Sequence, residues 1–266
     1  MAEKKRLDLL VVERGLATTL ARARTTIMAG LVLVDKVLMD KPGALVNVDS
    51  QLELKGEASP YVSRGGQKLA KALDKFAIDL NGRIVLDVGA STGGFTDCCL
   101  QAGAKLVYAV DVGYGQLAWA LRTNRKVINL ERTNIRHLTS EQLTQGMPDF
   151  CCINVAFISL RLVLPVIAQL GPRELVMLIK PQFEASREQV EKKGVVRSPA
   201  VHLLVINQVV AKAAELGFAL WNLDFSPVQG PQGNIEYLAH GFFADSLPAV
   251  SPSPQLVVEA AHAYFK

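Results

Sequence analysis

From Arg83 onward the chain alternates short apolar runs with longer amphipathic segments, and this alternation constrains its fold more than any other feature. Apolar runs without a polar face, separated by helices, are typical of a parallel sheet that helices cover on both sides. We therefore predict an α/β, Rossmann-like domain whose ligands bind at the carboxyl ends of the strands. Strands are expected at 83–88, 105–111, 126–130, 149–155, 174–180, 218–225 and 235–243, and helices near 94–103, 115–123, 159–170 and 199–216.

A small unit with shorter elements precedes this domain. RLDLLVVERGLA is expected to form one helix and TLARARTTIMAGL a second that ends at Gly30, with short strands after it. LDLLVVERGLA, AGLVLVD, and KPG followed by VNVD resemble the S4 RNA-binding domain. The predicted organisation is a small α+β S4-like domain over 6–58, a linker over 59–63, the large domain over 64–246, and a C-terminal tail or helix over 247–266.

Basic side chains are frequent in this small unit and just after it, as a phosphate-binding surface requires. Their other interpretation is a solvated basic face without a partner. The net charge of +4 and the isoelectric point near 8.9 agree with a polyanionic partner without identifying one. The candidates for RNA contacts are Arg6, Arg22, Arg24, Lys36, Lys41 and Arg64.

The composition argues against several other function classes. The four cysteines form two adjacent pairs, Cys98–Cys99 and Cys151–Cys152. Neighbouring side chains point in different directions, so we predict small buried residues in a reducing compartment and no metal site. The N-terminus lacks the apolar core of a signal peptide, and no run approaches the roughly 20 apolar residues that span a bilayer. We therefore expect a cytoplasmic protein.

The sharpest motif is LDVGASTGGFTD, at residues 86–97. An apolar strand ends there in an acid, and glycines follow where a tight turn opens into a helix and lets the backbone approach a ligand. The glycine spacing is GxxxGG, whereas dinucleotide-binding loops use GxGxxG around a pyrophosphate. At the end of the next strand, Asp111 stands where a carboxylate can accept both hydroxyls of a ribose.

An acid on the first strand, a GxxxGG loop and an acid that ends the second strand resemble the class I S-adenosylmethionine-dependent methyltransferases. The resemblance implies S-adenosylmethionine as the cofactor, with the first acid and the loop holding its methionine part and the second acid its ribose. It also implies that Asn134, in LERTNIR, meets the adenine edge. The cofactor-binding candidates are Asp87, Gly89, Ala90, Ser91, Gly93, Gly94, Asp111, Val112 and Asn134.

Methyl transfer to a hydroxyl needs a group that takes the hydroxyl proton and is held in line with the methyl donor. A lysine desolvated at a strand end can take this proton when carboxylates orient it. Lys180 ends the strand ELVMLIK, Lys68 lies on the helix that enters the domain, and Glu236 lies in a glycine-rich turn before the last strand. Taken alone, the two lysines are also compatible with ordinary surface lysines.

The full pattern resembles the TlyA family of ribosomal RNA 2′-O-methyltransferases, which are also called hemolysins. The resemblance covers essentially the whole chain and rests on YVSRGGQKL, DVGASTGGFTD, AFISL, KPQFE, KGVVR and GPQGNIEY behind an S4-like domain. It implies a catalytic domain like the FtsJ-type ribose methyltransferases, whose Lys-Asp-Lys-Glu tetrad places its lysines on Lys68 and Lys180 and its glutamate on Glu236. It further implies ribosomal RNA and ribosomal subunits as partners, and a cytidine ribose as the target.

The aspartate of this tetrad is replaced. Where the family pattern is D-V-S-F-I-S-L, this chain has Asn154 followed by VAFISL. Asp149, five residues earlier, begins the strand and should point to its other end. An amide can still accept a hydrogen bond from Lys180, but it cannot balance two ammonium groups. We therefore expect lower lysine pKa values and reduced or conditional activity, with donor binding retained.

Three functions remain open on the sequence. The first is an S-adenosylmethionine-dependent ribosomal RNA 2′-O-methyltransferase with Lys68, Asn154, Lys180 and Glu236 as its catalytic group. The second is a protein that binds RNA and S-adenosylmethionine with little or no catalysis. The third is a membrane-active hemolysin, which no apolar span, signal peptide or disulfide framework supports. Phe157 and Phe183 are either core residues or rings that contact the donor or a base.

Overall fold

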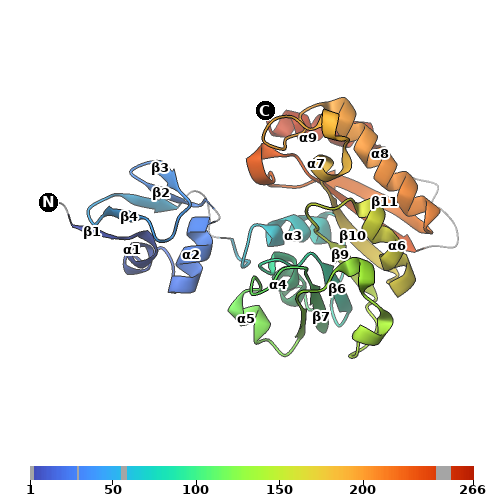
Figure 1. Cartoon of the computed structure of the whole chain (residues 1–266), viewed down its shortest axis with the longest axis horizontal. Helices are drawn as coiled ribbons and strands as arrows, with labels where there is room; N and C mark the ends of the chain where they lie inside the picture. Colours follow the sequence, from blue (N-terminus) through green and yellow to red (C-terminus); the bar gives the residue numbers. More distant parts are fainter. Residues whose placement is uncertain (1–2, 29, 55–58, 244–252) are drawn as a thin grey trace. The chain divides into compact units, whose positions relative to one another are not determined.

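The computed structural model describes residues 3–28, 30–54, 59–243 and 253–266. The chain divides into two compact units, Met1–Arg64 and Gly65–Lys266, whose elements are labelled in Figure 1. The predicted end of the S4-like domain at residue 58 and that of the large domain at residue 246 both lie outside the described residues.

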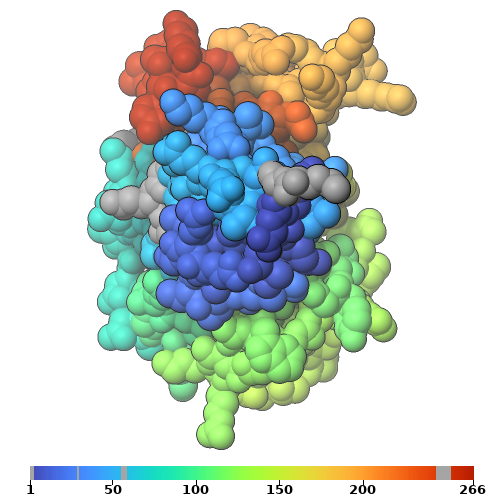
Figure 2. Space-filling model, turned by 90° about the vertical axis from the view of Figure 1, so that its left-hand side faces the viewer, coloured from blue at the N-terminus to red at the C-terminus, as the bar shows by residue number. Residues whose placement is uncertain are grey.

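The N-terminal unit contains the predicted pair of helices and a set of short strands. Its elements are β1 (Lys4–Arg6), α1 (Leu7–Glu13), α2 (Leu20–Met28), β2 (Val32–Val34), β3 (Val37–Met39), β4 (Leu45–Asn47) and β5 (Leu52–Leu54). β1 pairs antiparallel with β4, and β2 lies between β3 and β5. Leu7, Leu10, Ile27 and Val32 are buried in the apolar core that joins helices and strands. Figure 2 shows the atoms of this unit in shades of blue as one continuous surface, with residues 4–28 darker than the strands β2–β5 that follow them.

The large unit is built on a seven-stranded sheet with the order β11-β12-β10-β9-β6-β7-β8. The five strands from β10 to β8 pair in parallel, whereas β12 runs antiparallel to both β10 and β11. The predicted parallel-rich sheet is confirmed. The strands are β6 (Ile84–Val88), β7 (Leu106–Val110), β8 (Val127–Leu130), β9 (Phe150–Ile153), β10 (Glu174–Ile179), β11 (Phe218–Phe225) and β12 (Tyr237–Phe243).

Helices cover both faces of this sheet, as the fully apolar strands require. Figure 1 shows α3 (Gly65–Lys75) and α4 (Gly94–Gln101) on one side and α6 (Leu160–Leu170) and α8 (Pro199–Glu215) on the other. On the second side, α9 (Pro254–Tyr264) packs against α8 and β11.

Within the described ranges, no helix is both long and apolar enough to cross a membrane. The short helices are α5 (Trp119–Arg122), α7 (Pro181–Glu184), η1 (Ile135–His137), η2 (Ser140–Gln142), η3 (Arg187–Gln189) and η4 (Pro231–Gly233).

Several predicted elements are shorter in the structure, and two of these differences affect the site. The helix expected over 115–123 forms only as α5, since Gly113 and Gly115 precede it in the segment VGYGQ and Gly115 has a left-handed φ of 72°. The strand expected over 149–155 ends at Ile153, so Asn154 follows the strand and lies at the carboxyl edge of the sheet.

The order of the strands creates a crevice at this edge. Within the sheet, β7 and β8 follow β6 in one direction, whereas β9 and β10 follow it in the opposite direction. The loops after β6 and β9 therefore diverge and leave space at the carboxyl ends, where α/β sheets bind ligands.

Candidate active site

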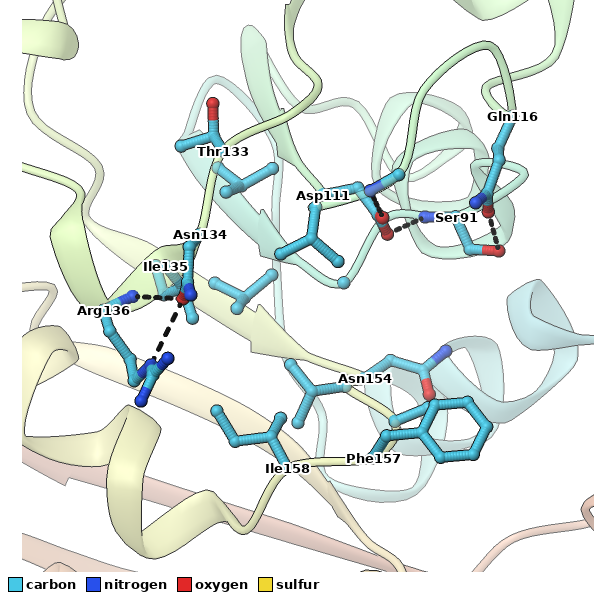
Figure 3. A pocket seen from close by; sticks show the side chains of 17 residues that line it. Ser91, Asp111, Gln116, Thr133, Asn134, Ile135, Arg136, Asn154, Phe157 and Ile158 are labelled. Atoms are coloured by element: carbon cyan, nitrogen blue, oxygen red, sulfur yellow. Dashed lines mark hydrogen bonds between the residues drawn. The ribbon is translucent and has the colours of Figure 1, made fainter.

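A pocket of about 580 Å³ lies at the carboxyl ends of β6, β7 and β9 (Figure 3), a volume in the usual range for small-molecule sites. We call it the donor pocket. Its walls combine apolar side chains with a few polar groups. The lining residues are Val88, Gly89, Ser91, Val110, Asp111, Val112, Gly113, Gln116, Thr133, Asn134, Ile135, Arg136, Asn154, Val155, Ala156, Phe157 and Ile158.

The glycine-rich loop after β6 can adopt its path only with glycine at two positions. Gly89 has φ 85°, and a Cβ there would lie 2.7 Å from the carbonyl oxygen of Asn154. Gly93 has φ 95°, and its Cβ would lie 2.2 Å from a methyl group of Leu121. The glycines thus let the loop close against the end of β9 and against α5, while Gly89 and Ser91 of the loop line the donor pocket.

Asp111, directly after β7, ties this loop to the second strand. Its Oδ2 accepts the Ser91 N–H over 2.8 Å, and its Oδ1 accepts the Gly113 N–H over 2.7 Å (Figure 3). A carboxylate has about four acceptor sites, so hydroxyl groups of a ligand can still bind to it. The role of Asp111 toward a ribose stays a prediction.

Asp87, the acid at the end of β6, lies beneath the loop and does not line the donor pocket. It is fully buried, and its Oδ2 accepts a 2.6 Å hydrogen bond from the Thr96 hydroxyl of α4. Burial raises the pKa of its carboxyl group to about 7. Among the described residues, no group donates to its Oδ1. Asp87 therefore supports the loop from below, and direct contact with the methionine part remains a prediction.

Asn134 lines the opposite wall of the donor pocket. Its side-chain oxygen accepts the Arg136 N–H over 3.1 Å and caps η1, which leaves its amide N–H groups for a ligand. Of the other predicted cofactor residues, Val112 lines the pocket, while Ala90, Gly93 and Gly94 do not. Three further residues line the pocket and were not predicted, namely Gln116, Thr133 and Arg136. The sequence signal that could have found them is their position within a few residues of Asp111 or Asn134.

Lys68 and Glu236, 168 positions apart in the sequence, form a buried ion pair. The Lys68 ammonium donates to Oε2 of Glu236, and their side chains are 10% and 1% exposed. The Oε1 of Glu236 has no hydrogen-bond partner among the described residues. A Cβ at Gly230 would lie 2.1 Å from that oxygen, so the glycine-rich turn GPQG makes room for this carboxylate.

Lys180, directly after β10, is close enough to this pair to feel both charges, and we call Lys68, Lys180 and Glu236 the catalytic cluster. Its Nζ donates to the Val155 carbonyl over 2.8 Å. Burial lowers the pKa of this amine to about 8; the charge of Glu236 opposes the shift, and that of Lys68 adds to it. An amine in this range can accept a proton near neutral pH.

Asn154 lines the donor pocket (Figure 3), and the carbonyl of its neighbour Val155, which lines the pocket too, accepts the Lys180 hydrogen bond. Its backbone N–H donates to the Val88 carbonyl over 2.8 Å, which fixes the end of β9 against β6. Within the described part of the chain, its side-chain amide makes no hydrogen bond, and Lys180 is oriented by the Val155 carbonyl instead of the expected amide. Asp149 precedes β9 at the other end of the sheet and pairs with Arg83 over 2.8 Å, so it cannot replace the missing acid.

Two aromatic rings stand beside the donor pocket. Phe157 is 92% exposed, and its ring centroid lies 5.1 Å from that of Phe183. The core interpretation is therefore wrong for Phe157, and a contact of its ring with the donor or a base stays a prediction. The rings face a hollow of about 480 Å³ that is lined by Arg136, Phe157, Ile158, Ser159, Leu162 and Phe183.

The predicted RNA-binding residues of the N-terminal unit differ in their contacts within the protein: some form ion pairs or hydrogen bonds, and others are exposed. Arg6 and Arg24 both pair with the buried carboxylate of Asp8, at 2.8 and 2.9 Å, yet about half of each arginine side chain stays exposed. These two guanidinium groups hold the pKa of Asp8 far below its usual range. Arg22 is half-buried and donates to the Ser59 carbonyl. Lys36, Lys41 and Arg64 are exposed.

Comparison with known proteins gives a consistent result. The FtsJ-like methyltransferase family model matches residues 61–243, and the S4 domain model matches residues 5–52. The chain is 51% identical over 241 residues to a Bacillus subtilis protein provisionally named rRNA methyltransferase YqxC, covering 90% of this chain and 86% of the relative. It is 43% identical over 240 residues to the 16S/23S rRNA (cytidine-2′-O)-methyltransferase TlyA of Mycobacterium tuberculosis, covering 89% of each.

A solved structure provisionally named as a hemolysin from Streptococcus thermophilus is similar over the whole chain. It superposes with a TM-score of 0.80 at 46% identity and covers 100% of this chain and 98% of that chain. The similarity therefore extends to the N-terminal unit as well as to the seven-stranded sheet.

Proposed function

Because the chain belongs to the FtsJ-like methyltransferase family and carries an S4 domain, we propose that it transfers the methyl group of S-adenosylmethionine to a ribose 2′-hydroxyl of ribosomal RNA. The relative from Mycobacterium tuberculosis, named for cytidine 2′-O-methylation of 16S and 23S rRNA, suggests a cytidine as the target. The observation that carries the proposal is the buried Lys180 amine, held beside the Lys68–Glu236 pair at the edge of a fitting donor pocket.

The residues of the donor pocket fit S-adenosylmethionine. Asp111 offers acceptors for ribose hydroxyls, and Asn134 offers N–H groups for the adenine edge. Gly89 has no Cβ, so a ligand can come close to the backbone at this position. When bound, S-adenosylmethionine supplies an electrophilic methyl group on a positively charged sulfur.

The cluster supplies the proton acceptor. A neutral Lys180 can take the proton of the 2′-hydroxyl, which makes the oxygen a better nucleophile. Glu236 balances the charge of Lys68 through one oxygen and keeps its other oxygen free to accept a hydrogen bond. With a pKa of about 8, roughly one tenth of Lys180 is neutral at pH 7.

Asn154 limits this chemistry. Two lysines share the single carboxylate of Glu236, and the uncharged amide adds hydrogen-bonding capacity without charge. The lowered pKa of Lys180 favours its neutral form, which is the base. Without a carboxylate at position 154, however, fewer groups orient Lys180 and the hydroxyl that accepts the methyl group. We therefore propose an active enzyme whose rate is reduced at neutral pH and increases as the pH rises.

The substrate is tested by incubating the protein and radiolabelled S-adenosylmethionine with isolated small and large ribosomal subunits, followed by mapping of 2′-O-methyl groups. We expect label at a defined cytidine ribose in at least one subunit. Label on a base, or none on either subunit at any pH, would contradict the proposed function.

A second function is favoured by one observation, the side-chain amide of Asn154 without a partner in the described residues. It is binding of RNA and S-adenosylmethionine with little catalysis. In that case donor and subunit binding would be measurable, and Asn154→Asp would gain methyl transfer that the natural chain lacks.

A further inference from the structure

Two segments approach each other beside the catalytic cluster. One is the segment 154–160, which is the loop after β9 with the first residue of α6, and we call it the β9–α6 loop. The other is the segment 180–184, which is Lys180 with the short helix α7, and we call it the β10–α7 turn. The Lys180–Val155 hydrogen bond joins them at one end, and the Phe157–Phe183 ring contact joins them in the middle. The two segments therefore run together over their whole length, and a third link closes the far end.

Glu184 forms this third link. Its Oε1 accepts the Leu160 N–H over 2.6 Å, and its Oε2 accepts the Ser159 hydroxyl over 2.6 Å. The Glu184 side chain is 2% exposed, and its ion-pair partner is Arg161, with Nε 3.7 Å from Oε2. It binds at the first turn of α6, where the exposed N–H groups of a helix favour a negative charge.

The β9–α6 loop needs an external support. Phe157, at its centre, has a left-handed φ of 62°, which is unfavourable for a bulky residue. Its side chain is 92% exposed and so contributes little burial to hold that conformation. The loop keeps its shape because its ends are fixed, at Asn154 by β6 and at Ser159 by Glu184.

We propose that Glu184 is a positioning residue for methyl transfer: its carboxylate holds the β9–α6 loop against the β10–α7 turn, and so keeps the Val155 carbonyl and Asn154 in place for Lys180. The inference rests on the proposed function and adds a residue outside the predicted tetrad. Glu184 lines neither the donor pocket nor the neighbouring hollow, so it acts through the loop.

Both oxygens of the carboxylate are required for this role. Ser159 and Leu160 each present a donor, and an amide provides an acceptor for only one of them. Glu184→Gln should therefore weaken the link, and Glu184→Ala should remove it. Ser159→Ala removes the hydrogen bond of the Ser159 hydroxyl and leaves that of the Leu160 N–H. Glu188, an exposed acid four residues later, provides the matched control Glu188→Gln.

Single-turnover methyl transfer is the first measurement. A misplaced reacting group costs up to about 100-fold in rate, so we expect a loss of this order for Glu184→Ala and about tenfold for Glu184→Gln and Ser159→Ala. Glu188→Gln should keep the natural rate. A natural rate in all three variants would overturn the proposal.

The second measurement follows the Lys180 amine itself, by its reactivity toward acetic anhydride across pH, with the modified lysine identified by mass spectrometry. Burial is the main cause of its low pKa, while Lys68 and Glu236 are the charged groups that face it. Loosening the loop admits water, so the midpoint of the Lys180 titration should rise in Glu184→Ala, less in Glu184→Gln, and stay unchanged in Glu188→Gln. A slower transfer with an unchanged Lys180 midpoint would mean a general structural role and would overturn the proposal.

Labelling also separates this inference from the proposed function, because it requires no methyl transfer. If the natural chain and Asn154→Asp both fail to methylate either subunit, the proposed function fails, and the Lys180 midpoint alone decides whether Glu184 holds the loop. If Glu184→Ala does not fold, Glu184→Gln and Ser159→Ala decide, since each retains part of the link.

Discussion

The donor pocket and the catalytic cluster lie at the same edge of one sheet, but their polar groups are satisfied to different degrees. In the donor pocket, both oxygens of Asp111 accept backbone N–H groups. In the cluster, one oxygen of Glu236 has no partner among the described residues, and Lys180 relies on a backbone carbonyl. The Asn154 amide, in the pocket wall next to Val155, has no partner in the described residues either. We infer that Asp111 and Lys180 are held by separate contacts, and we expect a substitution at one of them to change donor binding or methyl transfer without changing the other.

The largest effect is expected from removing the proposed base. Lys180→Met should lower the single-turnover rate about 1,000-fold, in the range typical for loss of a general base. Its dissociation constant for S-adenosylmethionine, measured by calorimetry, should change less than about threefold, because Lys180 does not line the donor pocket. Lys105→Met, at an exposed lysine before β7, is the control. Loss of donor affinity together with the rate would contradict the separation of the two regions.

The opposite pattern is expected for Asp111→Asn. The amide cannot accept both the Ser91 and Gly113 N–H groups and lacks the charge for ribose hydroxyls. Losing hydrogen bonds to a charged group costs about 1.5–3 kcal/mol, which is roughly a 10- to 150-fold weaker donor affinity. Asp74→Asn, at an exposed acid on α3, should bind the donor normally. At saturating donor the Asp111→Asn rate should recover; a rate that stays low would show that the two regions are coupled.

A smaller effect is expected in the N-terminal unit. If Lys41 contacts a phosphate, Lys41→Gln should weaken subunit binding at every site and reduce the salt dependence of log affinity by about one unit. Arg24→Gln is a less clean test, because Arg24 also holds the buried Asp8. Filter binding over a salt series measures the slope, with Lys4→Gln as the control on the same unit. An unchanged slope for Lys41→Gln would remove Lys41 from the predicted contacts.

Sequence patterns were sufficient to predict the fold and the place of the donor pocket. Strand-helix alternation indicates a parallel sheet, and acids at the ends of neighbouring strands must meet at one edge. Asp111 lies at that edge and lines the donor pocket, while its contact with a ribose stays a prediction. Lys68, Lys180 and Glu236 were located by family resemblance, since no local pattern relates residues 168 positions apart.

Other parts of the site depend on tertiary packing and were not predictable. Whether Asp87 faces the ligand or the helix beneath the loop depends on how α4 packs against β6, and its bond to Thr96 is invisible in the sequence. The left-handed φ of Phe157 has no local signal, because glycine or asparagine is the usual residue in that conformation. The Glu184 link joins residues 24 and 25 positions apart through a loop whose path the sequence does not specify.

The most direct test is the pH dependence of single-turnover methyl transfer for the natural chain and Asn154→Asp. Lys180 has its pKa lowered to about 8 from its ordinary 10.5, and its neutral form is the base, so the rate of the natural chain should rise with pH and level off above about 8. A carboxylate at position 154 favours the charged lysine, so it should move the midpoint of Asn154→Asp to higher pH while raising the plateau rate about tenfold or more. Equal plateaus and equal midpoints for the two proteins would contradict the assignment of position 154 to the catalytic group.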